Sequence, residues 1–354
     1  MQYFIHSENV KLVGRTFLHQ GVCWCGLSGS GIAFSFTGTY AAISFQGDDT
    51  TTGNCTEGKA RAAVYVNDVR VADFMMEEPE KTVQLFSSEI PEYVEVKVVK
   101  LSECPMSVIG IKSIEVQAEG GIYPLPISDR KIEFIGDSIT CGFGVDMEDP
   151  EVPFRTDTED VTKAYAYQTA QKLKADYSMV SYSGYGIISG YTEMDVPMKE
   201  QLVPTYYEKV GFSFGHPYGD IRLQDYKWDF SQYQPQLVIV NLGTNDDSYC
   251  NDDVKRQEEF AQEYAEFLKV IRKDNQEAKI LCTVGIMGDR IYPAVEKAVK
   301  IFREQTGDIK VCAMRFPEQL EEDGRVSCGH PTAVTHEKAA ELLTEHIRQI
   351  MNWQ

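Results

Sequence analysis

The 354-residue sequence has no long apolar segment, because no window approaches the roughly 18 consecutive apolar residues of a membrane-spanning helix. Its first residues, MQYFIHSENVKLVGRT, also lack the basic region and the apolar core of a secretory signal peptide. We therefore expect a soluble protein located in the cytoplasm; the alternative is a secreted protein of which this sequence is a trimmed part.

Positive charge is scarce. The 34 lysine and arginine residues face 54 aspartate and glutamate residues, which leaves a formal net charge of -20 at pH 7. A surface of this sign repels nucleic acid phosphates and anionic membrane surfaces. We therefore expect neither nucleic acid nor membrane as a partner, and a neutral or cationic substrate is favoured.

A disulfide framework is also absent. The nine cysteines are odd in number and spread over a long chain, which is typical of reduced thiols. Cys23 and Cys25 form a C-x-C pair, but no second group of cysteine or histidine residues stands at metal-ligand spacing. We expect these two to be strand residues, and we predict neither a metal site nor a cofactor.

The first third of the chain is rich in short β-strand patterns. Apolar residues alternate around Ile32–Phe36 and Ile43–Phe45, on either side of a Gly38-Thr39 pair where we expect a break. Asn67-Asp68 stands between two further strands and is a candidate two-residue hairpin turn. Glycines and prolines in EGGIYPLPISD mark a linker near residue 125. These features predict a β-sandwich or jelly-roll domain over residues 1–125.

Beyond the linker, strand-like and helix-like segments alternate, which predicts an α/β three-layer sandwich with a parallel sheet over residues 126–354. The expected strands are 132–135, 177–182, 237–242, 280–286 and 309–313, and the expected helices include 163–175, 253–272 and 333–352. The middle helix has an apolar stripe that we interpret as core rather than as a cofactor site, formed by Phe260, Tyr264, Phe267, Leu268 and Ile271.

The first strand of this second domain ends in Gly136-Asp137-Ser138-Ile139-Thr140. Open α/β sheets bind their ligands at the carboxyl ends of the strands. Ser138 is therefore a candidate nucleophile, and its own amide can face a developing anion. The alternative is that Ser138 only caps the helix that follows.

Three more segments are expected at the same edge of the sheet. Gly184 follows the second strand, where a glycine lets backbone approach an oxyanion, and Asn245 follows the third, where its side-chain amide can donate. Their alternatives are an ordinary turn and a helix cap. His330, on a loop before the last helix, is a candidate general base, although a single histidine is usually a surface or hydrogen-bonded residue.

Together these segments resemble the SGNH hydrolase superfamily, whose blocks carry a GDS serine, a glycine, a GxND asparagine and a late histidine. Ser138, Gly184, Asn245 and His330 take those roles by the resemblance, and Gly186 is the less favoured glycine. The N-terminal β domain, the opening VKLVGRT, the GDSITCGFGV segment and the HPT segment are similar to carbohydrate esterase family 2. That resemblance implies removal of acetyl groups from plant cell-wall polysaccharides, with acetylated xylan or glucomannan as substrate.

The sequence departs from the superfamily in one respect. Many SGNH enzymes have an aspartate two or three residues before the histidine, where this chain has Cys328 and Ser327. We predict a Ser138–His330 dyad whose imidazole is oriented by a backbone carbonyl, for which Cys328 is the named candidate. Asp323 is the alternative if its carboxylate folds back onto the histidine.

A second segment, Gly211-Phe212-Ser213-Phe214-Gly215, satisfies the G-x-S-x-G pattern of a nucleophile elbow. Its surroundings argue against that role, because an elbow lies between a strand and a helix, and here Pro217 follows within two residues. His216 is the only rival base, and it ranks behind His330.

The predicted chemistry is acyl transfer. Ser138 attacks the acetyl carbonyl while His330 takes its proton, and the amides of Ser138 and Gly184 with the Asn245 side chain form the oxyanion hole. Two other functions stay open, a lipase-like or thioesterase enzyme acting on short acyl esters and a carbohydrate-binding protein with a vestigial site. The sequence does not indicate the oligomeric state.

Overall fold

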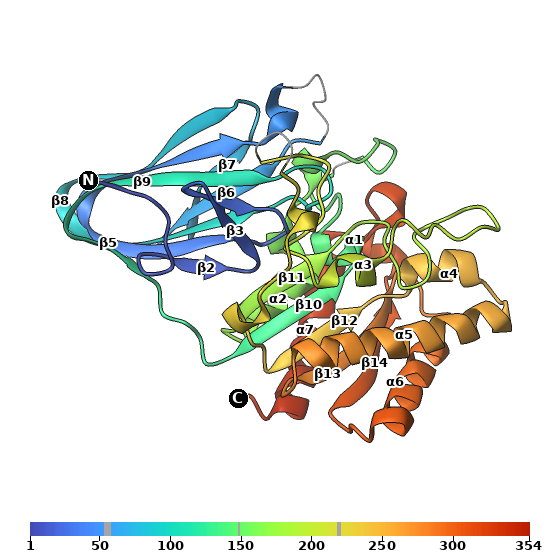
Figure 1. Cartoon of the computed structure of the whole chain (residues 1–354). Helices are drawn as coiled ribbons and strands as arrows, with labels where there is room; N and C mark the ends of the chain where they lie inside the picture. The colour runs from blue at the N-terminus through green and yellow to red at the C-terminus, as the bar shows by residue number, and fades with distance from the viewer. Residues whose placement is uncertain (53–57, 148, 218–220) are drawn as a thin grey trace. The chain divides into compact units, whose positions relative to one another are not determined.

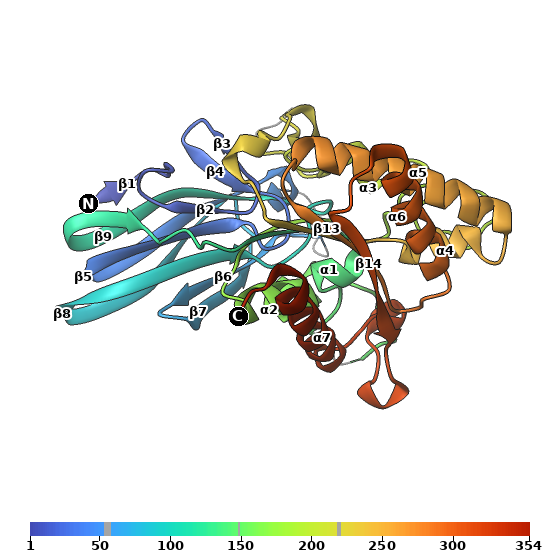
Figure 2. The ribbon, with the colours of Figure 1, turned by 90° about the horizontal axis from the view of Figure 1, so that it is seen from below.

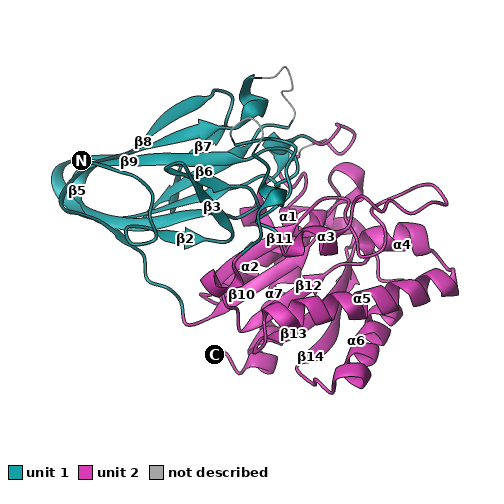
Figure 3. Cartoon of the chain, viewed as in Figure 1, with its two compact units in different colours: residues 1–128, 155–159, 209–228 teal, residues 129–154, 160–208, 229–354 magenta. Residues whose placement is uncertain are grey.

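The computed structural model describes residues 1–52, 58–147, 149–217 and 221–354. They form two compact units (Figure 3). Unit 1 contains Met1–Ser128, Arg155–Glu159 and Lys209–Trp228, and unit 2 contains the remaining segments, Asp129–Phe154, Asp160–Glu208 and Asp229–Gln354. Two short segments that the sequence division placed in the second domain therefore group with the first. None of the described helices is both long and apolar enough to cross a membrane.

Unit 1 is an antiparallel β-sandwich, as predicted, built around three long strands that bend through it (Figure 1). The strands pair in the order β3-β4-β9-β5-β8-β6-β7, with β1 on β9 and β2 on β5. Their bounds are β1 Gln2–Tyr3, β2 Lys11–Val13, β3 Thr16–His19, β4 Val22–Cys25, β5 Gly31–Gly47, β6 Arg61–Val66, β7 Val69–Met75, β8 Glu80–Lys100 and β9 Ile109–Pro124.

Two local predictions for this unit had different outcomes. Asn67 and Asp68 do form the turn between β6 and β7, with φ of 49° and 64°, as a tight hairpin requires. The expected break at Gly38-Thr39 is wrong, because β5 continues through it as one 17-residue strand and the pairing register shifts there. A glycine inside a strand pattern here marks a bulge rather than an end.

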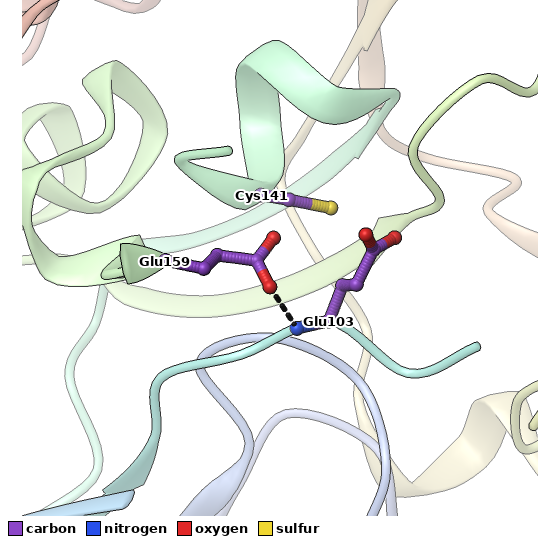
Figure 4. Close-up of side chains that lie close together, drawn as sticks. All are labelled: Glu103, Cys141 and Glu159. Carbon is purple, nitrogen blue, oxygen red and sulfur yellow. Dashed lines mark hydrogen bonds between the residues drawn. The ribbon is translucent and has the colours of Figure 1, made fainter. Parts of the chain in front are cut away.

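The later segments join unit 1 through buried hydrogen bonds. The Glu103 N–H donates to the Glu159 side chain over 2.7 Å (Figure 4), and the Thr156 hydroxyl donates to the Lys59 carbonyl over 2.7 Å. Lys100, almost fully buried, donates through its ammonium to the carbonyls of Ser102 and Glu103. The eight cysteines that the structure describes, which exclude Cys55, form no disulfide with one another, and Cys23 and Cys25 lie in β4 as expected.

Unit 2 is the predicted α/β sandwich around a five-stranded parallel sheet, in the order β11-β10-β12-β13-β14. The strands are β10 Lys131–Gly136, β11 Asp176–Ser181, β12 Leu237–Asn241, β13 Lys279–Ile286 and β14 Val311–Glu318. The helices are α1 Ser138–Cys141, α2 Tyr165–Lys172, α3 Val203–Tyr207, α4 Thr244–Cys250, α5 Val254–Asp274, α6 Tyr292–Thr306 and α7 Ala333–Met351.

Helices cover both faces of this sheet. Figure 2 shows α2 and α7 on one face and α5 and α6 on the other. The predicted stripe of α5 is buried from Phe260 to Ile271, as expected of a core face. Strand β10 lies between β11 and β12: the chain runs from β10 to β11 on one side and then crosses to β12 on the other side of β10. The carboxyl end of β10 is therefore the topological switch point at which such sheets bind ligands.

Candidate active site

Ser138 lies directly beyond the switch point. Strand β10 ends at Gly136, paired with Ser181 on one side and Asn241 on the other, and Ser138 is the first residue of α1. Asp137 is the helix cap, since its carboxylate accepts the Ile139 N–H over 3.0 Å. The capping alternative for Ser138 is therefore wrong, and its hydroxyl is available for another partner.

That partner is His330. Its Nε2 lies 2.7 Å from the Ser138 Oγ, although the two residues are 192 positions apart in the chain. Both are buried, with 5% and 9% of their surface exposed, so water does not compete freely for the contact. The predicted pair is thus assembled as a hydrogen-bonded serine and histidine.

The other imidazole nitrogen is held by backbone. His330 Nδ1 lies 3.0 Å from the Ser327 carbonyl oxygen, so the acceptor is one residue before the Cys328 named from the sequence. Cys328 and Gly329 both have positive φ, of 55° and 73°, and they turn the chain back toward the ring. A carbonyl oxygen can only accept a hydrogen bond, so Nδ1 carries the ring proton and donates it to Ser327. Nε2 then has a lone pair that faces the serine hydroxyl.

The alternative acid is engaged elsewhere. The Asp323 carboxylate accepts two hydrogen bonds from the Lys338 ammonium, at 2.7 and 2.8 Å, and the Asp323 backbone carbonyl accepts from the Thr332 hydroxyl. It therefore does not orient His330 in this structure.

Burial sets the charge of the imidazole. Removal from water lowers the pKa of His330 to about 4, and hydrogen bonds to the backbone of Ser327 and Cys328 only partly oppose that shift. The ring is therefore neutral near pH 7 and able to take a proton from Ser138.

Asn245 joins the site to the end of β11. It is the second residue of α4 and does not cap it, because the cap position belongs to Gly243. Its Nδ2 donates to the Tyr185 carbonyl over 2.8 Å and lies 3.5 Å from the Asp137 carboxylate. The amide therefore bridges the segment after β10 and the segment after β11, and its weaker contact is on the side of Ser138.

Gly184 lies in the segment after β11 and has a positive φ of 80°. Within the described ranges, neither the Ser138 N–H nor the Gly184 N–H donates to an acceptor of the protein. The Gly186 N–H, in contrast, donates to the Gln201 carbonyl over 3.1 Å. Of the two glycines, Gly184 is the one whose amide is available to an oxyanion, in line with the preference drawn from the sequence.

The sequence reasoning missed Asp246. Its fully buried carboxylate accepts the backbone N–H groups of Ile187, Ile188 and Ser189 at distances from 2.7 to 3.1 Å. A Cβ at Gly186 would lie 2.6 Å from this carboxylate, so only glycine fits there. Asp246 and Asn245 thus fix the loop that begins at Gly184 through hydrogen bonds to its backbone. The sequence did contain the pattern that could have identified this residue, since Asp246 is the aspartate of the Gly243-Thr244-Asn245-Asp246 motif.

The two rival residues have other partners. Ser213 is 1% exposed and its hydroxyl accepts the Gly215 N–H over 3.1 Å; among the described residues the next helix is a single 3-10 turn at Leu223–Asp225. The His216 Nδ1 lies 3.1 Å from the Asp49 carboxylate. Among the described residues of unit 2, no three histidine, cysteine or acidic side chains lie close enough together to hold a metal ion.

A neutral histidine bonded to a serine hydroxyl at the strand ends of a parallel sheet is the arrangement of a serine hydrolase. The chain belongs to the GDSL-like lipase/acylhydrolase family, whose model matches residues 134–338. The carbohydrate esterase 2 N-terminal model matches residues 12–126.

Similar proteins align with nearly the whole chain. The cellulase/esterase CelE of Acetivibrio thermocellus is 29% identical over 335 residues, 93% of this chain and 38% of that protein. An acetylxylan esterase / glucomannan deacetylase of Cellvibrio japonicus is 23% identical over 98% of this chain and 90% of its own. The chain thus spans less than two fifths of the first relative and most of the second.

Solved structures agree with the fold. The acetyl xylan esterase Est2A of Butyrivibrio proteoclasticus superposes with a TM-score of 0.88 at 26% identity, over 100% of this chain and 99% of that one. A family two carbohydrate esterase from Clostridium thermocellum in complex with cellohexaose gives a TM-score of 0.81 at 27% identity, over 98% of this chain and 100% of that one.

Proposed function

We propose that this chain is a serine esterase that removes O-acetyl groups from hemicellulose oligosaccharides or polysaccharides, with acetylated xylan or glucomannan as substrate. The observation that carries the proposal is the 2.7 Å contact between a buried serine hydroxyl and a neutral imidazole whose other nitrogen faces a carbonyl. The names of the similar proteins support acetyl xylan and glucomannan as the substrate class.

The reaction follows from the positions of the groups. As the Ser138 Oγ bonds to the acetyl carbon, its proton moves to His330 Nε2 and the carbonyl electron pair moves onto oxygen. The amides of Ser138 and Gly184 and the Asn245 side chain donate to that oxygen. His330 then protonates the departing sugar oxygen, leaving an acetyl-enzyme. The same imidazole next deprotonates a water molecule whose oxygen bonds to the acetyl carbon, and it returns this proton to the Ser138 Oγ as acetate leaves.

This mechanism uses a dyad rather than a triad. A carbonyl orients the imidazole as an aspartate would, but it carries no full charge to stabilise the imidazolium formed during the reaction. Two side chains, Ser138 and His330, therefore exchange the proton, and the Ser327 carbonyl holds the imidazole ring.

The test is acetate release from acetylated glucomannan and acetylated xylan oligosaccharides, measured enzymatically for the wild-type chain, for Ser138→Ala and for Ser213→Ala. We expect release by the wild type and by Ser213→Ala, and none above background by Ser138→Ala. Release that survives Ser138→Ala would contradict the proposal. The ratio of the two rates identifies the preferred polysaccharide.

A second candidate is glycan binding without turnover, which the cellohexaose complex of a similar protein favours. It predicts that a folded wild-type chain binds cello-oligosaccharides in calorimetry and releases no acetate from either substrate. A lipase-like or thioesterase function would instead appear as hydrolysis of acyl chains longer than propionyl.

A further inference from the structure

Phe143 places an aromatic ring on the catalytic imidazole. The ring centroids of Phe143 and His330 are 4.3 Å apart and their planes differ by 29°, a stacked arrangement. A second ring, that of Phe154, stacks on Phe143 with centroids 3.8 Å apart and planes 13° apart. Three rings are therefore stacked, with His330 at one end.

The backbone fixes this ring close to the nucleophile. The Phe143 N–H donates to the Ser138 carbonyl over 3.2 Å, so Phe143 belongs to the same turn as Ser138. It stands between Gly142 and Gly144, whose φ values are 79° and 62°. A Cβ at Gly142 would lie 2.7 Å from the Asp160 carbonyl oxygen, which explains the glycine there. One short turn thus carries both the nucleophile and a ring that packs on the base.

The charge balance of the site gives this contact a chemical use. The imidazole contacts the Ser138 hydroxyl, the Ser327 carbonyl and the Phe143 ring, and the titratable group whose charge interacts with it is the buried His336. None of the described carboxylates forms an ion pair with His330. The face of a benzene ring is electron-rich and attracts a cation placed over it.

We propose that Phe143 is a positioning residue for His330: its ring face keeps the imidazole plane directed at the Ser138 hydroxyl and stabilises the imidazolium formed when His330 takes the serine proton. Phe154 supports Phe143 from the outer side. The inference rests on the function proposed above, because it needs a reaction in which His330 becomes charged.

The test uses two substitutions at one position. Phe143→Leu keeps an apolar side chain without the ring face, and Phe143→Tyr keeps the ring. On 4-nitrophenyl acetate we expect Phe143→Leu to lower kcat roughly tenfold with KM within about threefold, and Phe143→Tyr to stay within about threefold of wild type. Phe154→Leu, which leaves the His330 contact in place, is the matched control and should fall between them.

The second measurement detects the imidazolium itself. A methylphosphonate adduct on Ser138 places an anionic oxygen where the tetrahedral oxyanion forms, so it keeps His330 charged into the alkaline range. With ¹⁵N-labelled histidine, we expect NMR to show the pKa of His330 in the adduct at least about half a unit lower in Phe143→Leu than in wild type, and unchanged in Phe143→Tyr.

The outcomes separate the two proposals. An adduct with the same His330 pKa in Phe143→Leu and wild type overturns the role of the ring and leaves the esterase intact. Equal losses of kcat in Phe143→Leu and Phe143→Tyr also overturn it, because shape rather than the ring would then matter. A wild-type chain that forms no adduct and hydrolyses no acetyl ester overturns both, since no imidazolium would form.

Discussion

Ser138 and Ser213 each lie two residues after a glycine, and only Ser138 has the surroundings of a nucleophile. Ser138 and Ser213 are both buried, at 5% and 1% exposure. Ser213 lies in the more familiar pattern, yet its hydroxyl is occupied by the Gly215 N–H in its own turn. Ser138 follows a central parallel strand and is bonded to an imidazole. Whether a serine can act as a nucleophile therefore depends more on the secondary structure that precedes it than on the residues beside it in the sequence.

The sharpest way to break this comparison is to remove each hydroxyl. Ser138→Ala should lower kcat on acetylated oligosaccharides by at least about a thousandfold, because the nucleophile is lost, and Ser213→Ala should stay within about twofold. Initial rates of acetate release measure both. Comparable losses in the two variants would mean that the decoy segment takes part in the chemistry.

The donors around Ser138 supply the next largest effect. Asn245→Ala removes a side-chain amide from the site and should lower kcat about a hundredfold, or about 3 kcal/mol of transition-state stabilisation, while the protein stays folded. Asn251→Ala, at the other end of α4, is the matched control and should retain activity. Turnover of Asn245→Ala close to wild type would exclude Asn245 from the oxyanion hole.

The loop that carries Gly184 gives a smaller effect. Asp246→Asn keeps the size of the side chain but replaces one acceptor oxygen by an amide that faces backbone N–H groups, so the loop should loosen. We expect kcat to fall about tenfold and thermal stability to fall as well. Asp247→Asn, at the next position and bonded to Arg290, is the control. An unchanged kcat in Asp246→Asn would show that Gly184 does not depend on this carboxylate.

The smallest effect is a shift along the pH axis. Because burial lowers the pKa of His330 to about 4, the loss of kcat/KM that comes from protonating this base should appear only below about pH 5. Burial raises the pKa of Asp246 to about 6, so its protonation should give a separate, smaller decline that Asp246→Asn lacks. His330 and His336 are both buried and neutral, so their contribution to the free energy of unfolding is lost as pH falls from about 6.5 toward 4. Burial raises the pKa of Asp137 to about 7 and that of Asp246 to about 6, so these two carboxyl groups take up protons in the folded state and oppose that loss. Circular dichroism separates the two effects. An acid limb at pH 6.5 that a folded Asp246→Asn protein retains would contradict the burial argument.

Much of the architecture could be predicted because local patterns determine it. The Asn67-Asp68 turn, the apolar stripe of α5 and the alternation of strands and helices each depend on residues close together in sequence. Where a strand ends was harder to predict. Strand β5 continues past Gly38 because its pairing with β8 and β9, which lie far away in the sequence, holds it extended there. The cytoplasmic location, the absence of nucleic acid and membrane partners, and the catalytic roles stay predictions.

The site was predictable only where function needs a particular side chain. Serine, asparagine and histidine were found because their chemistry restricts the choice of residue. The stack of Phe143 on His330 was not found, because it joins segments far apart in the sequence and aromatic residues usually indicate packing. The carbonyl named from the sequence was only part of the answer: Nδ1 lies 3.0 Å from the Ser327 carbonyl, and the backbone of Cys328 makes the lesser contribution to the pKa of His330.

The Ser327 carbonyl has a consequence for how this site tolerates change. Every amino acid has the same main-chain carbonyl, so replacing the Ser327 side chain leaves the group that orients His330 in place. A scan of single substitutions at Ser327 would therefore not reveal the role of this carbonyl. An inserted residue, or a changed turn at Cys328 and Gly329, would displace the carbonyl from the imidazole. In evolutionary terms, the support of the base is inherited through the length and shape of a loop rather than through the identity of any one residue.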